Sequence, residues 1–550
     1  MEQALLDELK SIIKGDVATD EETIRIHSMD KSIFAVPPQV VVFPKDSEDV
    51  QSLVKFVAKH KKENPSLSVT PRAAGTDMSG GDLNTSIVVS FIKYFNQPPT
   101  FAEGSAHVQP GVYYRDFEKA SLEHGLLYPA YPSSREICAM GGCLNNNAGG
   151  EKSLQYGKAE NYLIGCKMIF ADGNEYEVKP LTESELQIKM NQQNFEGEVY
   201  KKLFTLINDN YDDLKQAKPD VSKNSAGYYL WNVYDKDTKI FDINKLIVGA
   251  QGTLGLMTEA HIKLVPVKKH AEMLVIYVKD LSHLAEIVNV ILPFGPESLE
   301  TYDDVTLKLA LKYFSSFNKK LQTNSFETAI KFLPEFAMEF LTGLPKLTIQ
   351  AEFTGDEYKE IAEKITQVKE KLASFDVKIK VAPTEEAEKK YWLIRRDSFG
   401  LLSSRIKEMY ASPFIDDFVV KPEHLPEFLP KFNAIMEKYP SVKATFAGHV
   451  GNGNFHVIPL VKLTDPNEQQ LIPKICEEVF TLVMQYKGST SGEHNDGWVR
   501  TPYLHLQFDE KILNLFAETK KIFDPEGIFN PHKKTDPDQD FAMKHIRTTW

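Results

Sequence analysis

The chain has 550 residues, more than one hydrophobic core organises, so the sequence predicts two or three domains. The formal net charge of −13 argues against a nucleic-acid binder and leaves no basic surface for an anionic membrane. Four cysteines without a Cys-x-x-Cys pair exclude an iron–sulfur or structural zinc cassette and suit a reducing compartment such as the cytoplasm.

Alternating helices and strands are predicted from the N-terminus onward. Residues 2–14 read as an acidic amphipathic helix rather than a signal peptide, and a polar connection follows to residue 35. An apolar strand is predicted at 38–44, a helix at 47–61 and a second strand at 68–72. This β-α-β order calls for a parallel pair of strands. No apolar run reaches the roughly 20 residues of a membrane span, although a peripheral position at the inner face of the membrane stays open.

Two loops rich in glycine and other small residues stand out in the first 160 residues. Residues 72–81, Arg-Ala-Ala-Gly-Thr-Asp-Met-Ser-Gly-Gly, come directly after a strand, and such loops expose backbone N–H groups that bind phosphate. The loop is neither a Walker A loop nor a G-x-G-x-x-G fingerprint. Residues 140–150, Met-Gly-Gly-Cys-Leu-Asn-Asn-Asn-Ala-Gly-Gly, form the second loop, with Tyr156-Gly157 just after it. Together they indicate a flat, extended ligand that several loops contact.

The pattern stays mixed up to about residue 267. We expect short strands at 87–91 and 106–111, a helix at 114–123 and a hairpin of 163–171 with 175–178. Residues 183–225 read as a polar helical cap. Residues 245–257 read as a strand that runs into a third Gly-rich turn.

From about residue 268 the elements suggest a second domain. Strands are predicted at 273–278, 298–301, 346–353 and 377–381, and helices at 281–291, 303–340 and 358–375. Strands with helices on one face predict an α+β domain of ferredoxin-like character. A further helix over 385–396 ends in Arg395 and Arg396. An arginine here can grip a carboxylate with its planar fork, or can cap the helix or pair with Asp397.

Residues 445–460 carry two histidines in a predicted hairpin. Asn452-Gly453 is a dipeptide favoured in two-residue turns, and a turn there places His449 directly opposite His456, with Cβ atoms about 4.5–5.5 Å apart. Two imidazoles so placed can share one divalent metal. The segment Ser-Gly-Glu-His-Asn-Asp-Gly at 491–497 adds Glu493, which would complete a His/His/Glu site, and His494, a general base beside it.

The three loops, in this order and at these separations, resemble the flavin domain of the vanillyl-alcohol-oxidase superfamily. The similarity extends over nearly the whole chain and is greatest to the glycolate-oxidase-subunit/D-lactate-dehydrogenase branch of FAD-linked 2-hydroxy acid dehydrogenases. It implies an α+β fold. A two-subdomain FAD-binding domain of the PCMH type is expected at 36–267, after a lead-in at 1–35. A ferredoxin-like α+β substrate domain is expected at 268–500, with a helical insertion at 303–340, and a C-terminal helical segment at 501–550 that closes on the flavin.

The resemblance also implies which residues bind FAD. The first loop would hold the pyrophosphate, residues 132–149 would line the isoalloxazine and ribityl side, and residues 252–255 would close over the adenine half. The expected contacts are Pro71, Arg72, Ala73, Ala74, Gly75, Thr76, Asp77, Ser79, Gly80, Pro132, Ser133, Ser134, Met140, Gly141, Gly142, Asn147, Ala148, Gly149, Tyr156, Gly157, Gly252, Thr253, Gly255 and Asn530. Relatives with covalent flavin place a histidine where this chain has Ala74-Gly75-Thr76, so FAD is expected to be non-covalent. Gln251 stands where relatives often have Glu.

The same resemblance assigns the chemistry. His449, His456 and Glu493 match the metal ligands of relatives that carry a divalent ion, His494 matches the base, and Arg395 matches a substrate-binding arginine. A metal on the substrate hydroxyl lowers its pKa, and a neutral imidazole can then take the proton near neutral pH. Zinc and manganese both suit two imidazoles and one carboxylate. Histidines that bind substrate by hydrogen bonds, without a metal, remain an alternative.

The identity of the substrate stays open between two acids. The Asp-Gly-x-x-Arg form after His494 looks more like large fused relatives, some of which act on D-2-hydroxyglutarate, and Arg500 would then meet a second carboxylate. Ile458 argues against this, because dicarboxylate-specific relatives place a polar residue there. The expected reaction is oxidation of a D-2-hydroxy acid, D-lactate favoured, to the 2-oxo acid by hydride transfer to flavin N5. A flavin subunit of a glycolate oxidase complex and a non-redox flavin-dependent alkyl transferase are the rivals.

The resemblance implies two partners besides FAD and the metal. One is a small 2-hydroxy acid, and the other is a separate electron acceptor: a quinone, a cytochrome or an electron-transfer flavoprotein. A separate acceptor is expected because no ferredoxin-like cysteine module follows the closing motif Phe-Asp-Pro-Glu-Gly-Ile-Phe-Asn-Pro at 523–531. No nucleic-acid partner is expected, and a homodimer is an open alternative.

Overall fold

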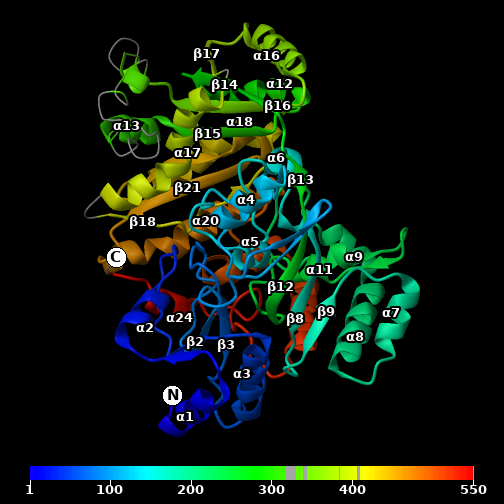
Figure 1. Ribbon diagram of the computed structural model, residues 1–550. Helices are drawn as coiled ribbons and strands as arrows, with labels where there is room; N and C mark the ends of the chain where they lie inside the picture. Colours follow the sequence, from blue (N-terminus) through cyan, green and yellow to red (C-terminus); the bar gives the residue numbers. More distant parts are fainter. Residues whose placement is uncertain are drawn as a thin grey trace.

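The computed structural model describes residues 1–313, 315, 327, 330–333, 335–337, 343–382, 384–405 and 409–548. Within these ranges the chain forms two lobes (Figure 1). The lower lobe in that view holds two main sheets built from the first half of the chain, and the upper lobe holds one large sheet built from later residues. Both lobes contribute to the cavity described below.

The first sheet has the strand order β1-β2-β4-β3. Its strands are β1 (Asp16–Ala18), β2 (Val40–Phe43), β3 (Val69–Arg72) and β4 (Ile87–Ser90), and its helices are α1 (Gln3–Ile12), α2 (Glu21–His27) and α3 (Ser47–His60). β2 and β3 both pair in parallel with β4. The predicted parallel β-α-β unit is confirmed, with β4 between its two strands. The lead-in is not only a polar connection, because α2 forms there and the Asp20 carboxylate caps it by accepting from the Thr23 backbone N–H.

The second sheet is antiparallel, with the order β5-β6-β12-β8-β9. Its strands are β5 (Thr100–Ala102), β6 (Ser105–Val108), β8 (Leu163–Ile169), β9 (Glu175–Val178) and β12 (Leu256–Lys263), and nearby helices are α4 (Tyr114–Glu123), α5 (Met140–Asn145), α7 (Glu183–Met190), α8 (Phe195–Asp209) and α9 (Tyr211–Ala217). The predicted hairpin and the helix at 114–123 are confirmed. The predicted cap at 183–225 is helical up to Ala217, at the right edge of Figure 1.

The strand predicted at 245–257 is wrong. The apolar run forms a short helix, α11 (Asn244–Ile247), and β12 begins only at Leu256. Between them φ is +83° at Gly249, +52° at Gln251 and +68° at Gly252. A backbone in the left-handed region cannot continue a strand, so these residues form a tight turn instead.

One sheet of eight strands forms the core of the upper lobe. Its order is β17-β14-β16-β15-β20-β21-β18, with β19 paired to β21, and its pairings are antiparallel. Its strands are β14 (His270–Val278), β15 (Ser298–Asp303), β16 (Leu347–Gly355), β17 (Val377–Ala382), β18 (Tyr410–Ala411), β19 (Phe418–Val419), β20 (Lys443–His449) and β21 (Asn454–Val461).

Helices cover both faces of this sheet, as the alternation along β14 shows. Leu274 and Ile276 pack in one core with α12 (Leu284–Ile291), α16 (Tyr358–Leu372) and α18 (Leu425–Glu437). Met273 and Val275 pack on the other face with Tyr391 and Trp392 of α17 (Glu385–Arg405). The expectation of helices on one face is therefore incomplete. The predicted helical stretch at 303–340 begins with α13 (Asp304–Lys312), and most of the remainder lies outside the described residues.

The chain returns to the first sheet after α20 (Leu471–Gln485) and α23 (Glu510–Phe523). Phe529 bridges in parallel to Val69, and the Asn530 side chain accepts from Thr70 Oγ1 at 2.8 Å. The same amide donates to the carbonyls of Gly81 and Gln251, at 2.8 and 2.6 Å. Residues far apart in the sequence thus build the lower lobe, which we call the flavin lobe because it carries the loops predicted to bind FAD. α24 (Gln539–Lys544) follows, and the residues after it pair with the segment after α2, because Ile546 bridges to Phe34.

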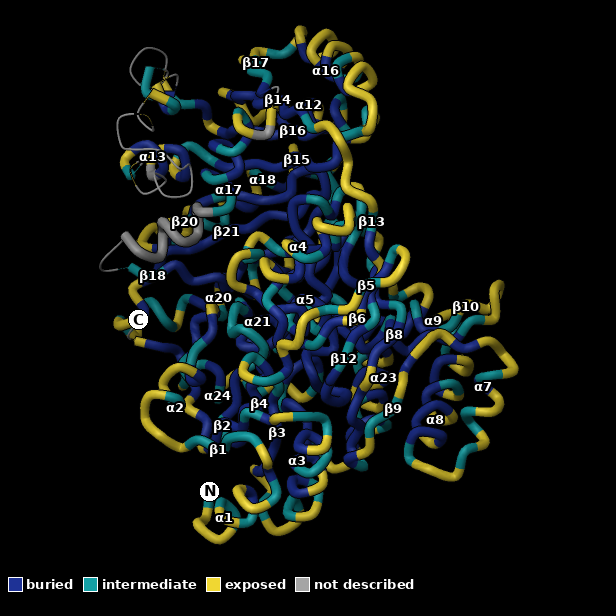
Figure 2. The backbone as a smooth tube through the Cα atoms, in the orientation of Figure 1, coloured by how far each residue is buried: buried dark blue, intermediate teal, exposed yellow. Residues whose placement is uncertain are grey.

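Burial follows the sheets (Figure 2), because the strands of the large sheet are buried while exposed residues gather on helices and loops at the rim. None of the helices in the described ranges combines the length and the apolar character needed to cross a membrane.

Candidate active site

A cavity of about 560 Å³ lies between the flavin loops and the large sheet. On the flavin side it is lined by residues that the sequence predicted to bind FAD: Pro71, Arg72, Ala73, Ala74, Gly75, Thr76, Asp77, Pro132, Ser133, Ser134, Gly141, Gly142 and Ala148. On the other side it is lined by Arg395, Arg396, Asp416, Ala447, His456, Ile458, Glu493 and His494. Residues more than 400 positions apart in sequence therefore face one space.

Other predicted FAD residues do not line the cavity. They are Ser79, Gly80, Met140, Asn147, Gly149, Tyr156, Gly157, Gly252, Thr253, Gly255 and Asn530. Several of these shape the lining from behind. The Ser79 hydroxyl donates to Asp77 at 2.8 Å, and the Asn530 amide holds the Gly81 carbonyl. Gly252 lies so close to Pro71 that a Cβ would meet its Cγ at 2.2 Å.

The cradle depends on glycines where the backbone turns or comes close to a neighbour. Gly75 has φ +67°, and a Cβ there would lie 2.1 Å from the Arg72 guanidinium. A Cβ on Gly141 would lie 2.5 Å from the Pro110 Cβ. The Asp77 carboxylate organises the loop by accepting from the Gly81 backbone N–H and from the Asn146 amide. Small residues and close backbone approach fit a dinucleotide cofactor with a flat ring system.

The histidine hairpin forms, but the predicted register is wrong by two residues. His449 pairs with Asn454 and Ala447 pairs with His456. The connection is a 3₁₀ turn over Val450–Asn452 followed by Gly453 at φ +64°, rather than a two-residue turn. A shift of two residues keeps both histidines on one face because side chains alternate with period two. They are therefore diagonal neighbours, with ring centroids 5.0 Å apart.

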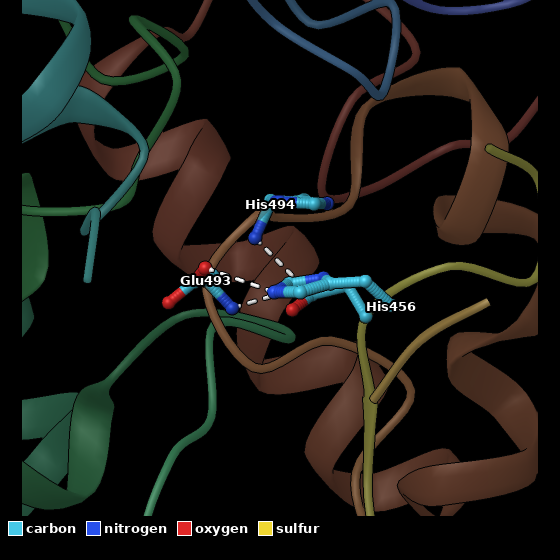
Figure 3. A group of neighbouring side chains, drawn as sticks. His456, Glu493 and His494 are labelled. Carbon is cyan, nitrogen blue, oxygen red and sulfur yellow. Dashed lines mark hydrogen bonds and ion pairs between the residues drawn. The ribbon is translucent and has the colours of Figure 1, made fainter. Parts of the chain in front are cut away.

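Both imidazoles point one ring nitrogen at the same carboxylate oxygen. His449 Nε2 lies 3.0 Å and His456 Nε2 lies 3.4 Å from Glu493 Oε1. The other ring nitrogen of His449 contacts Glu300 Oε1 at 2.6 Å. Figure 3 shows His456 and Glu493 facing each other, with His494 above them. Two Nε2 atoms and one carboxylate oxygen that converge in this way are a donor set suited to a divalent metal.

Asp416 and Asp417 complete the site, and neither was predicted from the sequence. Asp416 Oδ1 lies 3.1 Å from His456 Nδ1, and Asp416 Oδ2 lies 2.8 Å from His494 Nδ1. Asp417 Oδ2 accepts from Ser491 Oγ and from the backbone N–H groups of Glu493 and His494, at 2.7–2.9 Å. The signal in the sequence is a pair of acids inside the apolar run Phe-Ile-Asp-Asp-Phe-Val-Val at 414–420.

Asp417 stands in a second group of candidate metal ligands, with His456, Glu493 and His494. Its carboxylate is already saturated, because Oδ1 also accepts from Asn454 Nδ2 at 3.0 Å. Its φ of +76° is uncommon for a residue with a side chain, and it shows how tightly this bend is held. We therefore regard Asp417 as the residue that orders the turn around Glu493 and His494, not as a ligand.

The carboxylates set the protonation of the imidazoles. Burial lowers the pKa of His456, but Asp416 and Glu493 together raise it to about 9. Burial also works against the charged form of His494, and Asp417 and Asp416 raise its pKa above the ordinary value. Burial raises the pKa of the Glu493 carboxyl, yet Lys223 and His449 hold it well below its usual range. Asp416 and Glu493 therefore favour the protonated form of His456, and Glu493 itself is ionised.

Lys223 reaches this cluster from the flavin lobe, and no motif in the sequence predicted this contact. Its ammonium group lies 2.8 Å from Glu493 Oε2, with side chains 1% and 5% exposed. The neighbouring segment is held against the same turn, because the Ser225 backbone N–H donates to Ser491 O at 2.8 Å. One oxygen of Glu493 is thus occupied by Lys223, and the other faces the imidazoles.

The two predicted substrate arginines, Arg395 and Arg500, lie in different places. Arg395 lines the cavity, and its Nε donates to Glu300 Oε2 at 3.1 Å, so Glu300 links Arg395 to His449. Arg396 also lines the cavity and forms a two-pronged ion pair with Glu151 of the flavin lobe. Arg500 lies outside the lining, fully buried. It donates to the carbonyls of Asn495 and Asp416, at 2.9 and 2.6 Å. The structure therefore does not bring Arg500 to the substrate space.

Two family models match this chain. One, described as an FAD binding domain, matches residues 38–179, and the other, described as FAD linked oxidases, C-terminal domain, matches residues 267–534. The first range carries the glycine-rich loop at 72–81 and α5, and the second carries the histidines, Glu493 and Arg395. Each model thus covers one wall of the cavity.

Curated relatives extend over nearly the whole chain. A D-2-hydroxyglutarate dehydrogenase of Pantoea ananatis is 26% identical over 545 residues, which cover 97% of this chain and 52% of that protein. One of Stutzerimonas stutzeri is 26% identical over 549 residues, covering 96% of this chain and 98% of that protein. Glycolate oxidase subunit GlcD of Bacillus subtilis is 26% identical over 501 residues, covering 90% and 88%. The chain spans about half the length of the Pantoea protein.

Solved structures share the fold. An alkyldihydroxyacetonephosphate synthase superposes with a TM-score of 0.66 at 16% identity, covering 97% of this chain and 86% of that one. A 4-ethylphenol oxidase from Gulosibacter chungangensis gives a TM-score of 0.67 at 14% identity, covering 98% of both chains. At these identities the likeness shows the fold alone. The two matched models show that the chain has an FAD-binding domain and the C-terminal domain of FAD-linked oxidases, and the relatives over nearly its full length are consistent with the 2-hydroxy acid dehydrogenase branch.

Proposed function

We propose that the protein is an FAD-dependent dehydrogenase that oxidises a D-2-hydroxy acid to the corresponding 2-oxo acid. One observation carries the proposal. A cradle of small residues suited to FAD and a cluster of His456, Glu493 and His494 line the same cavity. A binding protein has no need of a buried base beside a metal-type donor set. Oxidation of a hydroxy acid needs a base for the hydroxyl proton on one wall and a flavin that accepts the Cα hydride on the other.

Different residues of the cavity have different roles in the proposed reaction. His494 takes the proton of the substrate hydroxyl, since its Nδ1 contacts Asp416 and its raised pKa makes it a stronger base than free histidine. Arg395 binds the substrate carboxylate from the cavity wall, with Glu300 fixing its guanidinium. FAD, held without a covalent bond by the loop around Ala74-Gly75-Thr76, supplies the hydride acceptor when bound.

A divalent metal, zinc or manganese, fits His449, His456 and Glu493, and when bound it supplies a Lewis acid that lowers the pKa of the substrate hydroxyl. Glu300 and Asp416 hold the Nδ1 atoms of the two histidines, so both Nε2 atoms are presented as ligands. Lys223 occupies Glu493 Oε2 and leaves Oε1 for the ion.

Two acids are candidates for the substrate. The names of the relatives from Pantoea and Stutzerimonas favour D-2-hydroxyglutarate. Two features of the described cavity wall favour D-lactate instead. Ile458 and Ala447 are apolar lining residues, and Arg500 is turned away into the protein interior. We place D-lactate first because a second carboxylate needs a cationic partner in a buried site, and Arg396 on this wall is already paired with Glu151.

The proposal is tested by anaerobic mixing with substrate, followed as loss of the visible flavin absorbance. A panel of D- and L-lactate, glycolate and D- and L-2-hydroxyglutarate, with and without a chelator, identifies the acid and the need for metal. His494→Asn is expected to retain FAD but to lose reduction by substrate. His505→Asn, an exposed histidine away from the cavity, serves as the control and is expected to react normally. Undiminished reduction in His494→Asn contradicts the role of the base.

Electrons leave the reduced flavin for a separate acceptor in this proposal: a quinone, a cytochrome or an electron-transfer flavoprotein. A comparison of artificial and physiological acceptors after reduction by substrate identifies the class. Activity of the isolated chain with a dye acceptor would also separate an independent enzyme from the flavin subunit of a glycolate-oxidising complex. Bleaching by a 2-hydroxy acid excludes a non-redox transferase.

A further inference from the structure

Asp416 touches two imidazoles that have different proposed roles. It is fully buried on the cavity wall, between β18 and β19. Its Oδ1 accepts from His456 Nδ1 at 3.1 Å, and its Oδ2 lies 2.8 Å from His494 Nδ1. The two rings stack nearly in parallel, with centroids 4.9 Å apart and planes inclined by 16°. One carboxylate therefore spans a proposed metal ligand and the proposed base.

The contact with His494 is exclusive within the described part of the chain. Asp416 Oδ2 and His494 Nδ1 lie 2.8 Å apart, and neither of these buried atoms has a hydrogen-bond partner among the described residues, so the ion-pair contact between them is the interaction available to both. An ionised carboxylate only accepts, so each Nδ1 that meets it must carry the hydrogen. In a neutral imidazole the lone pair is then on Nε2. For His456 this is the nitrogen that faces Glu493 Oε1.

The backbone of Asp416 is itself fixed to the turn that carries His494. Arg500 Nη2 donates to Asp416 O at 2.6 Å, and Arg500 Nη1 donates to Asn495 O at 2.9 Å. Arg500 is 0% exposed, so this bridge is shielded from water. The position of Asp416 relative to the two rings is thus fixed by the fold.

We propose that Asp416 is a positioning residue that fixes the tautomer of His456 and of His494 together, and so couples metal binding to proton removal. The claim for the base rests on the proposed function, whereas the tautomers themselves do not. With hydrogen on both Nδ1 atoms, His456 presents Nε2 as a ligand and His494 presents Nε2 as a proton acceptor. A single carboxylate serves both because its two oxygens are equivalent acceptors.

Asp416→Asn breaks this equivalence with almost no change of shape. The amide offers one acceptor and one donor, so one of the two Nδ1 atoms meets an N–H group and its ring must move its hydrogen to Nε2. If His456 is the ring that moves its hydrogen to Nε2, zinc binding is expected to weaken about 10–100-fold. If His494 is that ring, flavin reduction is expected to slow by about 100-fold or more. Asp303→Asn is the matched control, because Asp303 is a largely buried carboxylate of the same sheet that accepts from the backbone N–H groups of Thr306 and Phe446.

The tautomers are read directly from nitrogen–proton correlation spectra of the zinc-loaded holoprotein labelled with ¹⁵N-histidine. His456→Asn and His494→Asn assign the two signals. We expect both rings to carry hydrogen on Nδ1 in the parent protein and one ring to carry it on Nε2 in Asp416→Asn, with the matching loss in zinc affinity or reduction rate. Unchanged tautomers with zinc affinity and rate within twofold of the parent overturn the proposal, as do equal losses in Asp303→Asn. If no 2-hydroxy acid reduces the parent flavin, the proposed function fails, while the spectra and the zinc titration still decide the role of Asp416.

Discussion

Replacing Lys223 by Met tests how much the ion pair between the lobes contributes to stability. The substitution keeps an unbranched side chain of similar length and removes the charge that faces Glu493 Oε2 at 2.8 Å. Glu493 then stays buried, with its second oxygen deprived of the nearest cation. The imidazoles on Oε1 remain, so the change isolates one side of the carboxylate.

The expected magnitude follows from distance and burial. At 2.8 Å and an effective dielectric constant of about 20, two unit charges attract by about 6 kcal/mol. Desolvation of both groups offsets part of this, and loss of one partner from a buried pair typically costs about 3–5 kcal/mol. We therefore expect the free energy of unfolding to fall by about 3–5 kcal/mol in Lys223→Met, and Lys223→Arg to recover most of that loss.

Urea unfolding of the FAD-loaded protein, followed by circular dichroism, measures the difference. Lys202→Met is the control, because Lys202 pairs with Glu198 at 3.4 Å with side chains 58% and 64% exposed. Pairs so exposed contribute little, so no measurable change is expected there. A loss below about 1 kcal/mol in Lys223→Met would refute the view that this pair holds the lobes and Glu493 together.

Two further substitutions probe the cradle and Arg500. In Gly75→Ala the new Cβ meets the Arg72 guanidinium at a backbone φ of +67°, so FAD affinity is expected to fall about tenfold or more, measured by flavin fluorescence titration; unchanged affinity contradicts a rigid cradle. In Arg500→Lys two hydrogen bonds to buried carbonyls are weakened, so the melting temperature is expected to fall while KM for the preferred acid stays within twofold. A KM that rises only for dicarboxylates would instead make Arg500 a substrate ligand.

Local patterns in the sequence located most elements of both lobes. The helix at 114–123 and the strand at 175–178 agree with the structure because each is set by its own periodicity and flanking turn residues. The strand expected at 245–257 failed because its apolar residues are buried equally well in a short helix. Positive φ at Gly249 and Gly252 then decides the path, and composition alone does not show this.

The candidate site was predicted where chemistry lies in short motifs and missed where it depends on tertiary contact. His449, His456 and Glu493 converge as expected, yet the register changed because a 3₁₀ turn replaced the expected Asn-Gly turn. Lys223 is 270 positions from Glu493, and no local pattern links them. Arg500 lies beside the motif in sequence but points away from the cavity, because its guanidinium donates to the buried backbone carbonyls of Asn495 and Asp416.

The hydrogen bond between Thr70 and Asn530 joins residues 460 positions apart, and this has a consequence for biosynthesis. At about 5–20 residues per second, a ribosome needs roughly 25–90 seconds to travel from one to the other. During that interval the nascent flavin lobe lacks the side chain that ties down the Gly81 and Gln251 carbonyls. Tight capture of the dinucleotide therefore has to wait until Asn530 has been synthesised and has docked on these two carbonyls.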